Sequence, residues 1–128
     1  MEKLDYGIIG NCKSAALISK KGSLDWCCLP QFDSASVFAK ILDENKGGKF
    51  AFRVDDSYSI EQRYLWKTNI LSTTFSSDQH AFQVLDFMPR YLKPDGSFYA
   101  PPDVIRFIRV LKGTPKLVVD YEPRLNYA

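Results

Sequence analysis

Apolar and polar residues alternate with a period of two along most of this 128-residue chain. Successive side chains of a β-strand point to opposite faces, so such alternation is typical of strands that bury one face. The pattern predicts strands at residues 16–19, 24–28, 49–54, 58–66, 70–76 and 81–88. Clusters rich in Gly, Asp and Ser mark turns between several of these segments. The spacing predicts an all-β fold, an antiparallel β-sandwich.

Two further runs, residues 104–111 and 116–121, are rich in Val, Ile and Leu. The segment Lys112-Gly113-Thr114-Pro115 lies between them and supplies residues that favour tight turns. Two strands joined by so short a connection are typical of a β-hairpin. We therefore predict that these two strands form a hairpin.

One segment, residues 36–42, has helical spacing instead. Its apolar side chains recur at positions i, i+1, i+4 and i+5, as on one face of a helix. They are Val37, Phe38, Ile41 and Leu42. Ser34 or Ser36 is suited to cap the start of a helix, and Gly47-Gly48 is suited to end it. The sandwich is therefore expected to contain one short helix.

The chain has the size of one domain with a single core, because domains of about 100–150 residues are the commonest. Paired prolines exclude residues 96–102 from a central strand, so this stretch is predicted to be an exposed connection. After the strand predicted at residues 116–121, no helix or polar tail closes the sheet. We expect residues 1–128 to be one β-sandwich domain, cut from a longer protein.

Composition allows such a core and argues against two classes of partner. Hydrophobic residues make up 45% of the chain and aromatic residues 14%. The formal net charge is only +2, too small to create the basic field that binding to a phosphate backbone requires. The sequence has no apolar run near the roughly 20 residues that span a bilayer, and residues 1–5 contain no apolar signal core. We expect a soluble, cytoplasmic protein with no nucleic acid or membrane partner.

The three cysteines, Cys12, Cys27 and Cys28, indicate a reducing compartment. Adjacent strand residues point to opposite faces, so Cys27 and Cys28 are not expected to bond each other. A zinc site needs a spacing such as Cys-x-x-Cys with further ligands, whereas this chain has one Cys-Cys pair and one histidine, His80. We predict buried, reduced thiols, a solvated His80, no metal ion and no cofactor.

Four blocks of residues match a known family in order and spacing. They are YGIIGN at 6–11 with AALIS at 15–19 and GSLDW at 22–26; CCLPQFDS at 27–34 with SVF at 36–38; RYL at 63–65 with TNIL at 68–71 and TTF at 73–75; and DFMPR at 86–90. On these blocks the chain resembles the amino-terminal, trehalase-like domain of bacterial and archaeal proteins of glycoside hydrolase family fifteen, the glucoamylases and trehalases. Gln31 departs from the pattern, since many members have Arg there, and it carries no fixed positive charge.

The resemblance implies a larger β-sandwich, a linker and a barrel of paired α-helices that contains two catalytic glutamates. It also implies hydrolysis of an α-glucosidic bond with inversion, for which an acid and a base carboxyl group stand roughly 6.5–9.5 Å apart. This chain ends before any such barrel, and its acidic residues are scattered over turns and strands. The implied role is a non-catalytic domain, inactive by itself, that packs on the catalytic barrel and helps shape its active face. The α-glucoside is then the substrate of the barrel.

Two other functions stay open on the sequence alone. A free-standing carbohydrate-binding module presents an exposed aromatic platform, whereas a packing domain exposes an apolar patch at its interface. A purely self-associating β protein requires a chain that is complete as written. If strands are missing, a sheet edge and part of the core face are uncovered, so we expect homo-oligomers through an exposed edge or apolar face.

The loop after the strand at residues 24–28 contains the first candidate site. It combines aromatic faces with an amide and a carboxylate, a mixture that suits sugar rings and their hydroxyl groups. The residues are Trp26, Pro30, Gln31, Phe32 and Asp33. In the functional interpretation this loop faces the barrel and borders its sugar pocket. In the structural alternative Trp26 and Phe32 belong to the core and Asp33 caps the predicted helix.

A second candidate loop contains Gly10 and Asn11, with Gly7 before them. Two glycines so close together indicate a near approach of the backbone or a positive φ, so loop geometry is the expected explanation. Farther along, Asp86 and Arg90 flank the end of the strand at residues 81–88. They are expected to form an ion pair or to hydrogen-bond turn amides.

Overall fold

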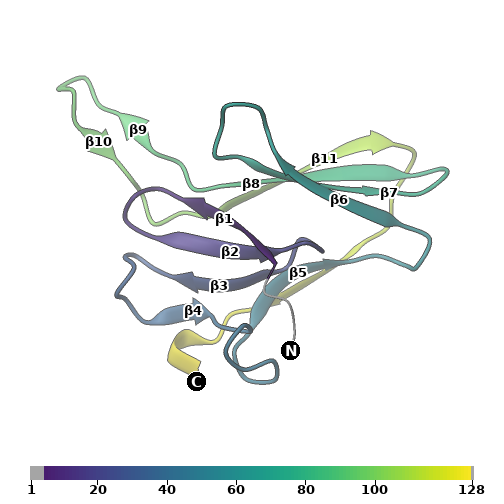
Figure 1. The fold of residues 1–128 in the computed structure, drawn as a ribbon, viewed down its shortest axis with the longest axis horizontal. Helices are drawn as coiled ribbons and strands as arrows, with labels where there is room; N and C mark the ends of the chain where they lie inside the picture. The colour runs from purple at the N-terminus through teal and green to yellow at the C-terminus, as the bar shows by residue number, and fades with distance from the viewer. Residues whose placement is uncertain (1–4, 128) are drawn as a thin grey trace.

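The computed structural model describes residues 5–127, which form twelve β-strands and one short 3-10 turn. Figure 1 shows the strands in two layers, with a hairpin that projects from one end. Among these residues no helix is long and apolar enough to cross a membrane. In chain order the elements are β1 (Tyr6–Gly10), β2 (Ala15–Ser19), β3 (Leu24–Cys28), β4 (Ser36–Phe38), β5 (Lys49–Arg53), β6 (Ser59–Tyr64), β7 (Leu71–Ser76), β8 (Ala81–Phe87), β9 (Tyr91–Leu92), β10 (Phe98–Tyr99), β11 (Ile105–Lys112), β12 (Val118–Glu122) and η1 (Leu125–Tyr127).

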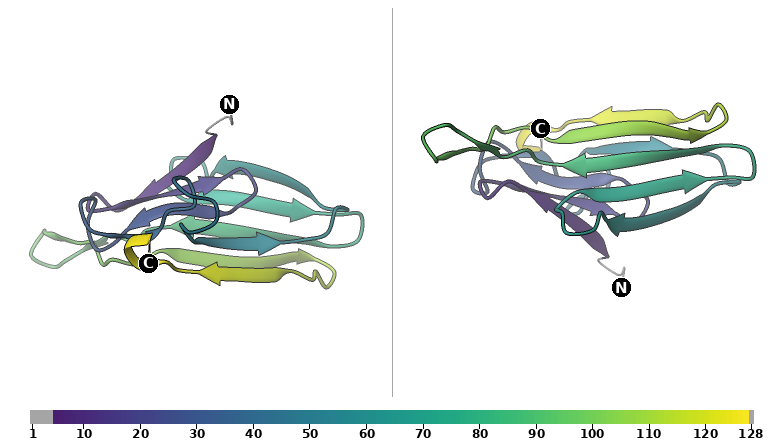
Figure 2. Two further views of the ribbon diagram at one scale, coloured as in Figure 1. Left: turned by 90° about the horizontal axis from the view of Figure 1, so that it is seen from below. Right: turned by 90° about the horizontal axis from the view of Figure 1, so that it is seen from above.

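Two antiparallel sheets account for most of the fold. The first has the strand order β1-β2-β3-β5-β12, and β4 pairs with β3 beside this path. The second has the order β11-β8-β7-β6. Figure 2 shows the two sheets packed against each other, while the ribbon β9–β10 forms a small sheet of its own. The predicted antiparallel β-sandwich is confirmed.

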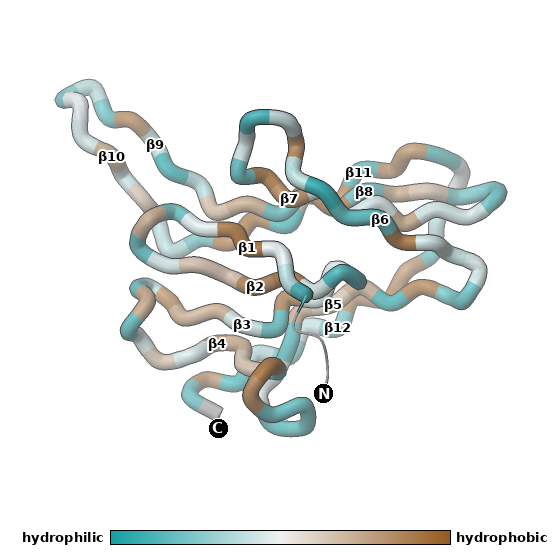
Figure 3. The backbone as a smooth tube through the Cα atoms, in the orientation of Figure 1, coloured by the Kyte–Doolittle hydropathy of each residue, from teal (hydrophilic) through white to brown (hydrophobic). Residues whose placement is uncertain are grey.

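The core lies between the sheets and consists of two apolar clusters. The larger cluster joins Ile18 and Leu24 of the first sheet to Leu71 of the second. The smaller cluster contains Phe75 and Phe82, whose rings stack with their centroids 4.6 Å apart. Figure 3 shows apolar residues on strands of both sheets, as the alternating pattern requires. Because burying apolar surface stabilises a fold by about 25 cal/mol per Å², these inward side chains hold the two layers together.

The segment predicted to be a helix is a strand followed by turns. Ser36–Phe38 form β4, which pairs antiparallel with β3 through Cys27↔Phe38. After β4 the chain turns back, and Leu42 lies exposed on the surface. The helix prediction is wrong because the edge of β3 offers this stretch a strand partner. In addition, Phe38 joins the core and Leu42 does not, so the apolar stripe is never buried as one face.

The predicted hairpin between the last two strands is also wrong. β11 pairs with β8 at the edge of the second sheet, whereas β12 pairs with β5 at the edge of the first. The connection at residues 113–117 therefore carries the chain from one sheet to the other. A turn signal specifies a change of direction, and the strand edges that are within reach decide the pairing.

Arg106 on β11 forms a buried ion pair and also links the second sheet to the first. Arg106 on β11 lies opposite Asp86 on β8, with 2.7 Å from Nε to Oδ1 and 3.1 Å from Nη2 to Oδ2. Both side chains are almost fully buried. The guanidinium also donates to the carbonyl oxygens of Phe50, at 2.6 Å, and Gly22, both of which belong to the first layer. Burial raises the pKa of Asp86, and the adjacent arginine opposes this rise.

The partner of Asp86 is thus Arg106 and not Arg90, which corrects the sequence prediction. Arg90 instead lies over the ring of Phe98, with its Cζ atom 4.0 Å from the ring centroid. Arg106 was missed, although a charged residue within an otherwise apolar run is a signal. A charged residue at an inward position of an apolar strand must find a partner, because an unpaired buried charge is very costly.

Candidate functional site

Two loops meet at one end of the sandwich. They are the β1–β2 turn and the β3–β4 loop, residues 11–14 and 29–35, which we call the loop end (Figure 1, left). The backbone N–H of Phe32 donates to the carbonyl oxygen of Lys13 at 2.9 Å, and the Ser14 hydroxyl donates to the carbonyl oxygen of Cys28. The structure therefore brings together the two loops that the sequence analysis singled out separately.

Asn11 and Gly10 shape the β1–β2 turn. Oδ1 of Asn11 accepts hydrogen bonds from the backbone N–H groups of Lys13, at 3.0 Å, and Ser14, at 2.9 Å. Its Nδ2 donates to the carbonyl oxygen of Pro101 at 2.9 Å, and the side chain is only 2% exposed. A Cβ atom added at Gly10 would stand 3.1 Å from the Ser14 carbonyl oxygen, tighter than most such contacts. Both residues therefore hold the turn, and Asn11 also ties it to the base of the β9–β10 hairpin.

The tip of the β3–β4 loop points into solvent. Phe32 is 62% exposed, and Pro30, Gln31 and Asp33 are exposed beside it. The loop is closed by two hydrogen bonds of 3.1 Å, from the Gln31 N–H to the Ser34 hydroxyl and from the Ser34 N–H to the Gln31 carbonyl oxygen. The structural alternative for Phe32 and Asp33 is wrong, because the ring lies outside the core and no helix follows the loop.

A shallow open depression of about 360 Å³ lies at this tip. Its lining contains an aromatic ring, an amide, a carboxylate and an ammonium group. The lining residues are Cys12, Lys13, Gln31, Phe32 and Asp33. Such a surface offers a flat apolar face with polar groups around it, the mixture that suits a sugar ring or a second protein surface.

Trp26 lies apart from this depression. It is a half-buried residue of β3, opposite Leu17 of β2, and it is absent from the lining of the depression. The residues predicted as one site therefore divide into a loop group at residues 30–33 and a strand residue. Trp26 lies on the surface of the sheet because β3 pairs with β2 on one side and with β4 and β5 on the other. The sequence pattern did not show this position.

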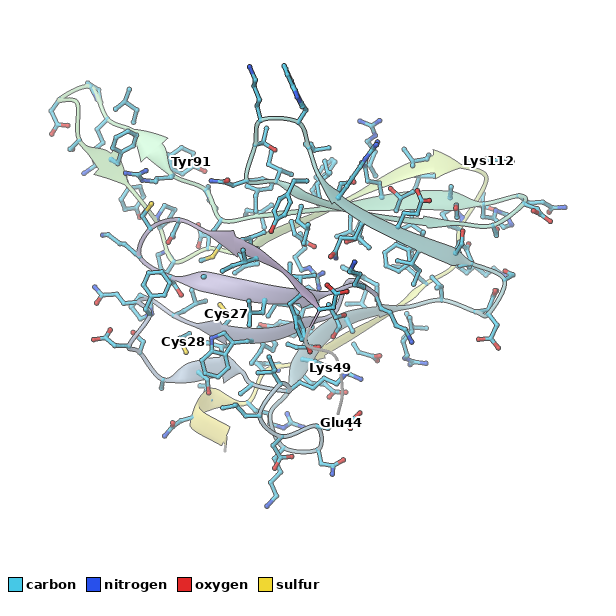
Figure 4. All side chains as sticks on the ribbon, in the orientation of Figure 1. Cys27, Cys28, Glu44, Lys49, Tyr91 and Lys112 are labelled. Atoms are coloured by element: carbon cyan, nitrogen blue, oxygen red, sulfur yellow. The ribbon has the colours of Figure 1, made fainter. Side chains whose placement is uncertain are left out.

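The three cysteines have different surroundings, and all are free thiols. Cys27 and Cys28 lie on β3 (Figure 4) and are buried, whereas Cys12 is exposed in the β1–β2 turn at a positive φ of 73°. The prediction of buried thiols is therefore wrong for Cys12. Burial, and then the neighbouring Cys28, raise the pKa of Cys27 to about 12, so this thiol is not a nucleophile at neutral pH.

The two carboxylates that are buried among the described residues support the fold. Asp25 accepts from the Tyr6 hydroxyl at 3.0 Å and from the Ser23 hydroxyl, and Asp86 is bound by Arg106. Asp25 belongs to the first sheet and Asp86 to the second. Within residues 5–127, no three His, Cys, Asp or Glu side chains gather as they would around a metal ion.

His80 has a definite partner. Its Nδ1 accepts a hydrogen bond of 3.0 Å from the Thr114 N–H, so it ties the β7–β8 turn to the connection between β11 and β12. The side chain is half-buried. The prediction of a solvated histidine is corrected, because the connection that crosses between the sheets passes beside it.

One long side of the sandwich is open. β11 and β12 are the outer strands of the two sheets, and both run along this side (Figure 2). Among residues 5–127 no further strand pairs with either of them on the outside. Most of their large apolar side chains are exposed, and the chain thus leaves two strand edges uncovered on the same side.

The exposed residues on this side include some that face inward. Ile108 and Val110 lie opposite the fully buried Val84 and Phe82 of β8, so they belong to the core face of the second sheet. Val119 and Tyr121 of β12 lie opposite Phe52 and Phe50 in the same way. These four side chains, which we call the open edge, are 39–61% exposed. The core is therefore incomplete along this side, since inward positions normally lie in contact with other side chains.

Comparison with known proteins gives a consistent result. The family described as "Trehalase-like, N-terminal" matches residues 2–128. A trehalase of Thermoplasma volcanium is 38% identical over 98% of this chain, and a trehalase of Mycolicibacterium smegmatis is 30% identical over 96% of it. Trehalase 1 of Sulfolobus acidocaldarius is 45% identical over 65% of the chain. No significant match was found among solved structures.

The matched relatives are much longer proteins. The chain corresponds to 20% of the Thermoplasma and Mycolicibacterium trehalases and to 14% of the Sulfolobus protein. It therefore spans about one fifth of the length of the curated relatives that it matches along most of its own length. Because the family match covers nearly every residue, this chain belongs to the trehalase-like N-terminal domain family.

Proposed function

We propose that the chain is the non-catalytic N-terminal domain of a glycoside hydrolase of the glucoamylase and trehalase type. In this role it packs on a catalytic barrel of the same protein and helps shape the active face. The observation that carries the proposal is the family match over residues 2–128, together with relatives named trehalase that are about five times longer. We assign the parent protein to glycoside hydrolase family fifteen, with an α-glucoside as substrate of the barrel.

The loop end is the part of the domain that we propose to face the barrel. Phe32, Gln31 and Asp33 project from a loop braced by hydrogen bonds, so they are presented in a fixed geometry. A preorganised aromatic ring with polar neighbours can border a sugar pocket at little cost in conformational entropy. No catalytic role is proposed for this chain, and we expect the isolated domain to be inactive.

The open edge is proposed to be covered by strands that follow this segment in the longer protein. The four side chains of the open edge face inward yet are exposed, and further strands would cover them. When these strands are absent, two copies of the chain would cover each other through the same edges or the same apolar face. Homo-oligomers of the isolated chain follow from this proposal.

We also propose a reducing, cytoplasmic location. Cys27 and Cys28 are adjacent in one strand and are buried as free thiols. Cys12 is a free thiol on the surface. Exposed free cysteines persist where the surroundings keep them reduced, which favours the cytoplasm.

A second candidate function is a free-standing carbohydrate-binding module. The observation that favours it is the exposure of several aromatic rings, of which Trp66 is the most exposed among residues 5–126, at 84%. Titration with maltose or trehalose while tryptophan fluorescence is recorded distinguishes the two functions. A saturable change in the isolated chain supports a binding module, and an unchanged spectrum supports a packing domain.

The principal test uses the full-length protein together with this chain alone. We expect glucose release from trehalose or maltose by the full-length protein and none by residues 1–128. Phe32→Ala and Asp33→Ala should lower turnover of the full-length protein and leave the melting temperature of residues 1–128 unchanged, because both side chains are exposed in this chain. Trp66→Ala is the matched control, since it removes an exposed ring outside the loop end. Glucose release by the isolated chain would contradict the proposal.

A further inference from the structure

The β9–β10 hairpin is an arm that extends beyond both sheets. Tyr91 pairs with Tyr99 and Leu92 with Phe98, and a tight turn with Gly96 at a positive φ of 85° joins the two strands. Figure 1 shows the arm projecting from one end, and Figure 4 places Tyr91 there and Lys112 at the opposite end. We call residues 90–100 the arm. The sequence predicted only an exposed connection here.

Both faces of the arm carry exposed apolar side chains. Tyr91 and Tyr99 share one face and are 56% and 50% exposed, and Leu92 and Phe98 share the other and are 68% and 53% exposed. An isolated two-stranded hairpin is only marginally stable in water. Exposed apolar side chains on both faces of a two-stranded ribbon are therefore typical of an element that a partner covers.

The base of the arm is held firmly. Pro101 and Ala100 are buried, and the Pro101 carbonyl oxygen accepts hydrogen bonds from Asn11 Nδ2, at 2.9 Å, and from the Asp103 N–H, at 2.8 Å. On the other strand Met88 is buried in the larger core cluster. The direction of the arm is therefore set by the sandwich. Preorganisation of this kind lowers the entropic cost of docking.

The arm also carries positive charge. The guanidinium of Arg90 lies 4.0 Å from the ring centroid of Phe98, and Nζ of Lys93 lies 5.6 Å from that of Tyr99. The carboxylate at the tip, Asp95, already accepts hydrogen bonds from the backbone and hydroxyl groups of Ser97. A surface complementary to the arm is therefore an apolar groove with carboxylates at its rim.

The position of the chain end indicates where such a groove lies. In the views of Figures 1 and 2 the C-terminal end of the domain lies toward the same end of the long axis as the arm and the loop end. Residues that follow in a longer protein therefore begin toward this end of the long axis. The relatives have about four fifths of their length outside the matched part, enough to build a groove around it.

We propose that the arm docks into an apolar groove, rimmed by carboxylates, in the part of the full-length protein that follows this domain. This inference rests on the proposed function only in that the domain belongs to a longer enzyme. The arm then fixes the orientation of the sandwich on the catalytic part, independently of the open edge. Arg90 and Lys93 meet the carboxylates of the rim, and Tyr91, Leu92, Phe98 and Tyr99 fill the groove.

The test is site-specific photo-crosslinking in the full-length protein. We replace Leu92 with p-benzoylphenylalanine, irradiate, and identify the joined peptides by mass spectrometry. The expected result is a crosslink within one chain, from the arm to a peptide that follows residue 128. The same probe at Trp66, which is more exposed, is the control and should give a several-fold lower yield. A crosslink between two copies, or equal yields at both positions, would overturn the proposal.

A second measurement gives an independent readout. Leu92→Ser with Phe98→Ser should leave the melting temperature of residues 1–128 unchanged, because both side chains are exposed there. In the full-length protein the same pair should speed amide hydrogen exchange in residues 90–100 and in the groove. Unchanged exchange in the full-length protein would contradict docking. An intact crosslink in a protein that hydrolyses no α-glucoside would instead count against the proposed function and leave the arm assignment standing.

Discussion

The two long sides of the sandwich differ in how well the sheets are joined there. At the side formed by β1 and β6, the Tyr64 hydroxyl accepts from the Ile8 N–H at 2.9 Å and donates to the Ile8 carbonyl oxygen at 2.8 Å. Nearby, Gln62 Nε2 of β6 donates to the Ser19 carbonyl oxygen of β2 at 2.8 Å. These contacts tie the two sheets together. At the side formed by β11 and β12, inward residues such as Val110 and Tyr121 are exposed instead.

The comparison shows what alternation specifies and what it does not. Alternation identifies the face that is suited to a core, and the neighbouring elements decide whether that face is buried. Val84 and Val110 illustrate this, because both face inward in the same sheet and are 0% and 59% exposed. Contacts between the sheets thus close one long side, whereas inward side chains stay exposed on the other.

The largest effect is expected at the ion pair that anchors β11. Arg106→Ala leaves the Asp86 carboxylate buried without its partner, which costs about 3–5 kcal/mol of the free energy of unfolding. Urea unfolding measures the loss. Arg53→Ala is the control, because Arg53 pairs with Asp120 on the surface, and the unfolding midpoint should barely move. Equal effects at the two arginines would show that the buried pair does not anchor β11.

A matched pair of valines tests the two sides directly. Val84→Ala removes two buried methyl groups and leaves a cavity, so we expect a loss of about 2 kcal/mol. Val110→Ala should cost several-fold less in the isolated chain, because that side chain is already in contact with water. In the full-length protein the cost of Val110→Ala should rise toward that of Val84→Ala. A cost that stays small there would show that the open edge remains uncovered.

Self-association tests whether the open edge attracts a partner. The isolated chain should show a sedimentation coefficient that increases with concentration, and Tyr121→Lys should abolish the increase, since a charge at an uncovered edge opposes pairing. Trp66→Lys is the control, because it changes an exposed aromatic residue away from this edge. A strictly monomeric wild-type chain at high concentration would remove the basis for an incomplete sandwich.

At neutral pH the smallest effect is expected from the thiols, and it grows only in alkaline solution. Burial raises the pKa of Cys27 from 9.0 to about 12, so the folded state keeps this thiol neutral where the unfolded state ionises it. Its contribution to stability is therefore fully present below pH 9 and is lost as the pH rises from 9 to about 12. The melting temperature of the wild type should fall more steeply over this range than that of Cys27→Ala. Melting temperatures that fall equally with pH in the two proteins would contradict the raised pKa of Cys27.

The difference in burial between Cys12 and the other two cysteines predicts their reactivity at neutral pH. A thiol reagent should modify Cys12 alone in the folded protein, because Cys27 and Cys28 are buried. After unfolding all three should react. Modification of more than one thiol in the folded chain would show that β3 opens to solvent.

The sequence alone determined most of the strands, the faces that they are suited to bury and the family. It missed β1, whose Gly7 and Gly10 were expected in a loop, as well as β4, β9 and β10. Most strands lie within two residues of the predicted segments, because a period of two is a local property of the chain. The blocks from YGIIGN to DFMPR were enough to identify the trehalase-like N-terminal domain, which the family match confirms. The prolines identified residues 96–102 as an exposed connection. The sequence did not predict the arm to which this connection belongs.

The tertiary structure decided which strands pair and which side chains meet. Residues 36–42 have a pattern compatible with a helix, and the available edge of β3 made the first three of them a strand. β11 and β12 pair with β8 and β5 because periodicity specifies a face and carries no information about the partner. The contact between Asp86 and Arg106, the hydrogen bond from Asn11 to Pro101, and the separation of Trp26 from Phe32 all depend on long-range packing. A local pattern cannot encode contacts between residues that only the folded arrangement brings together.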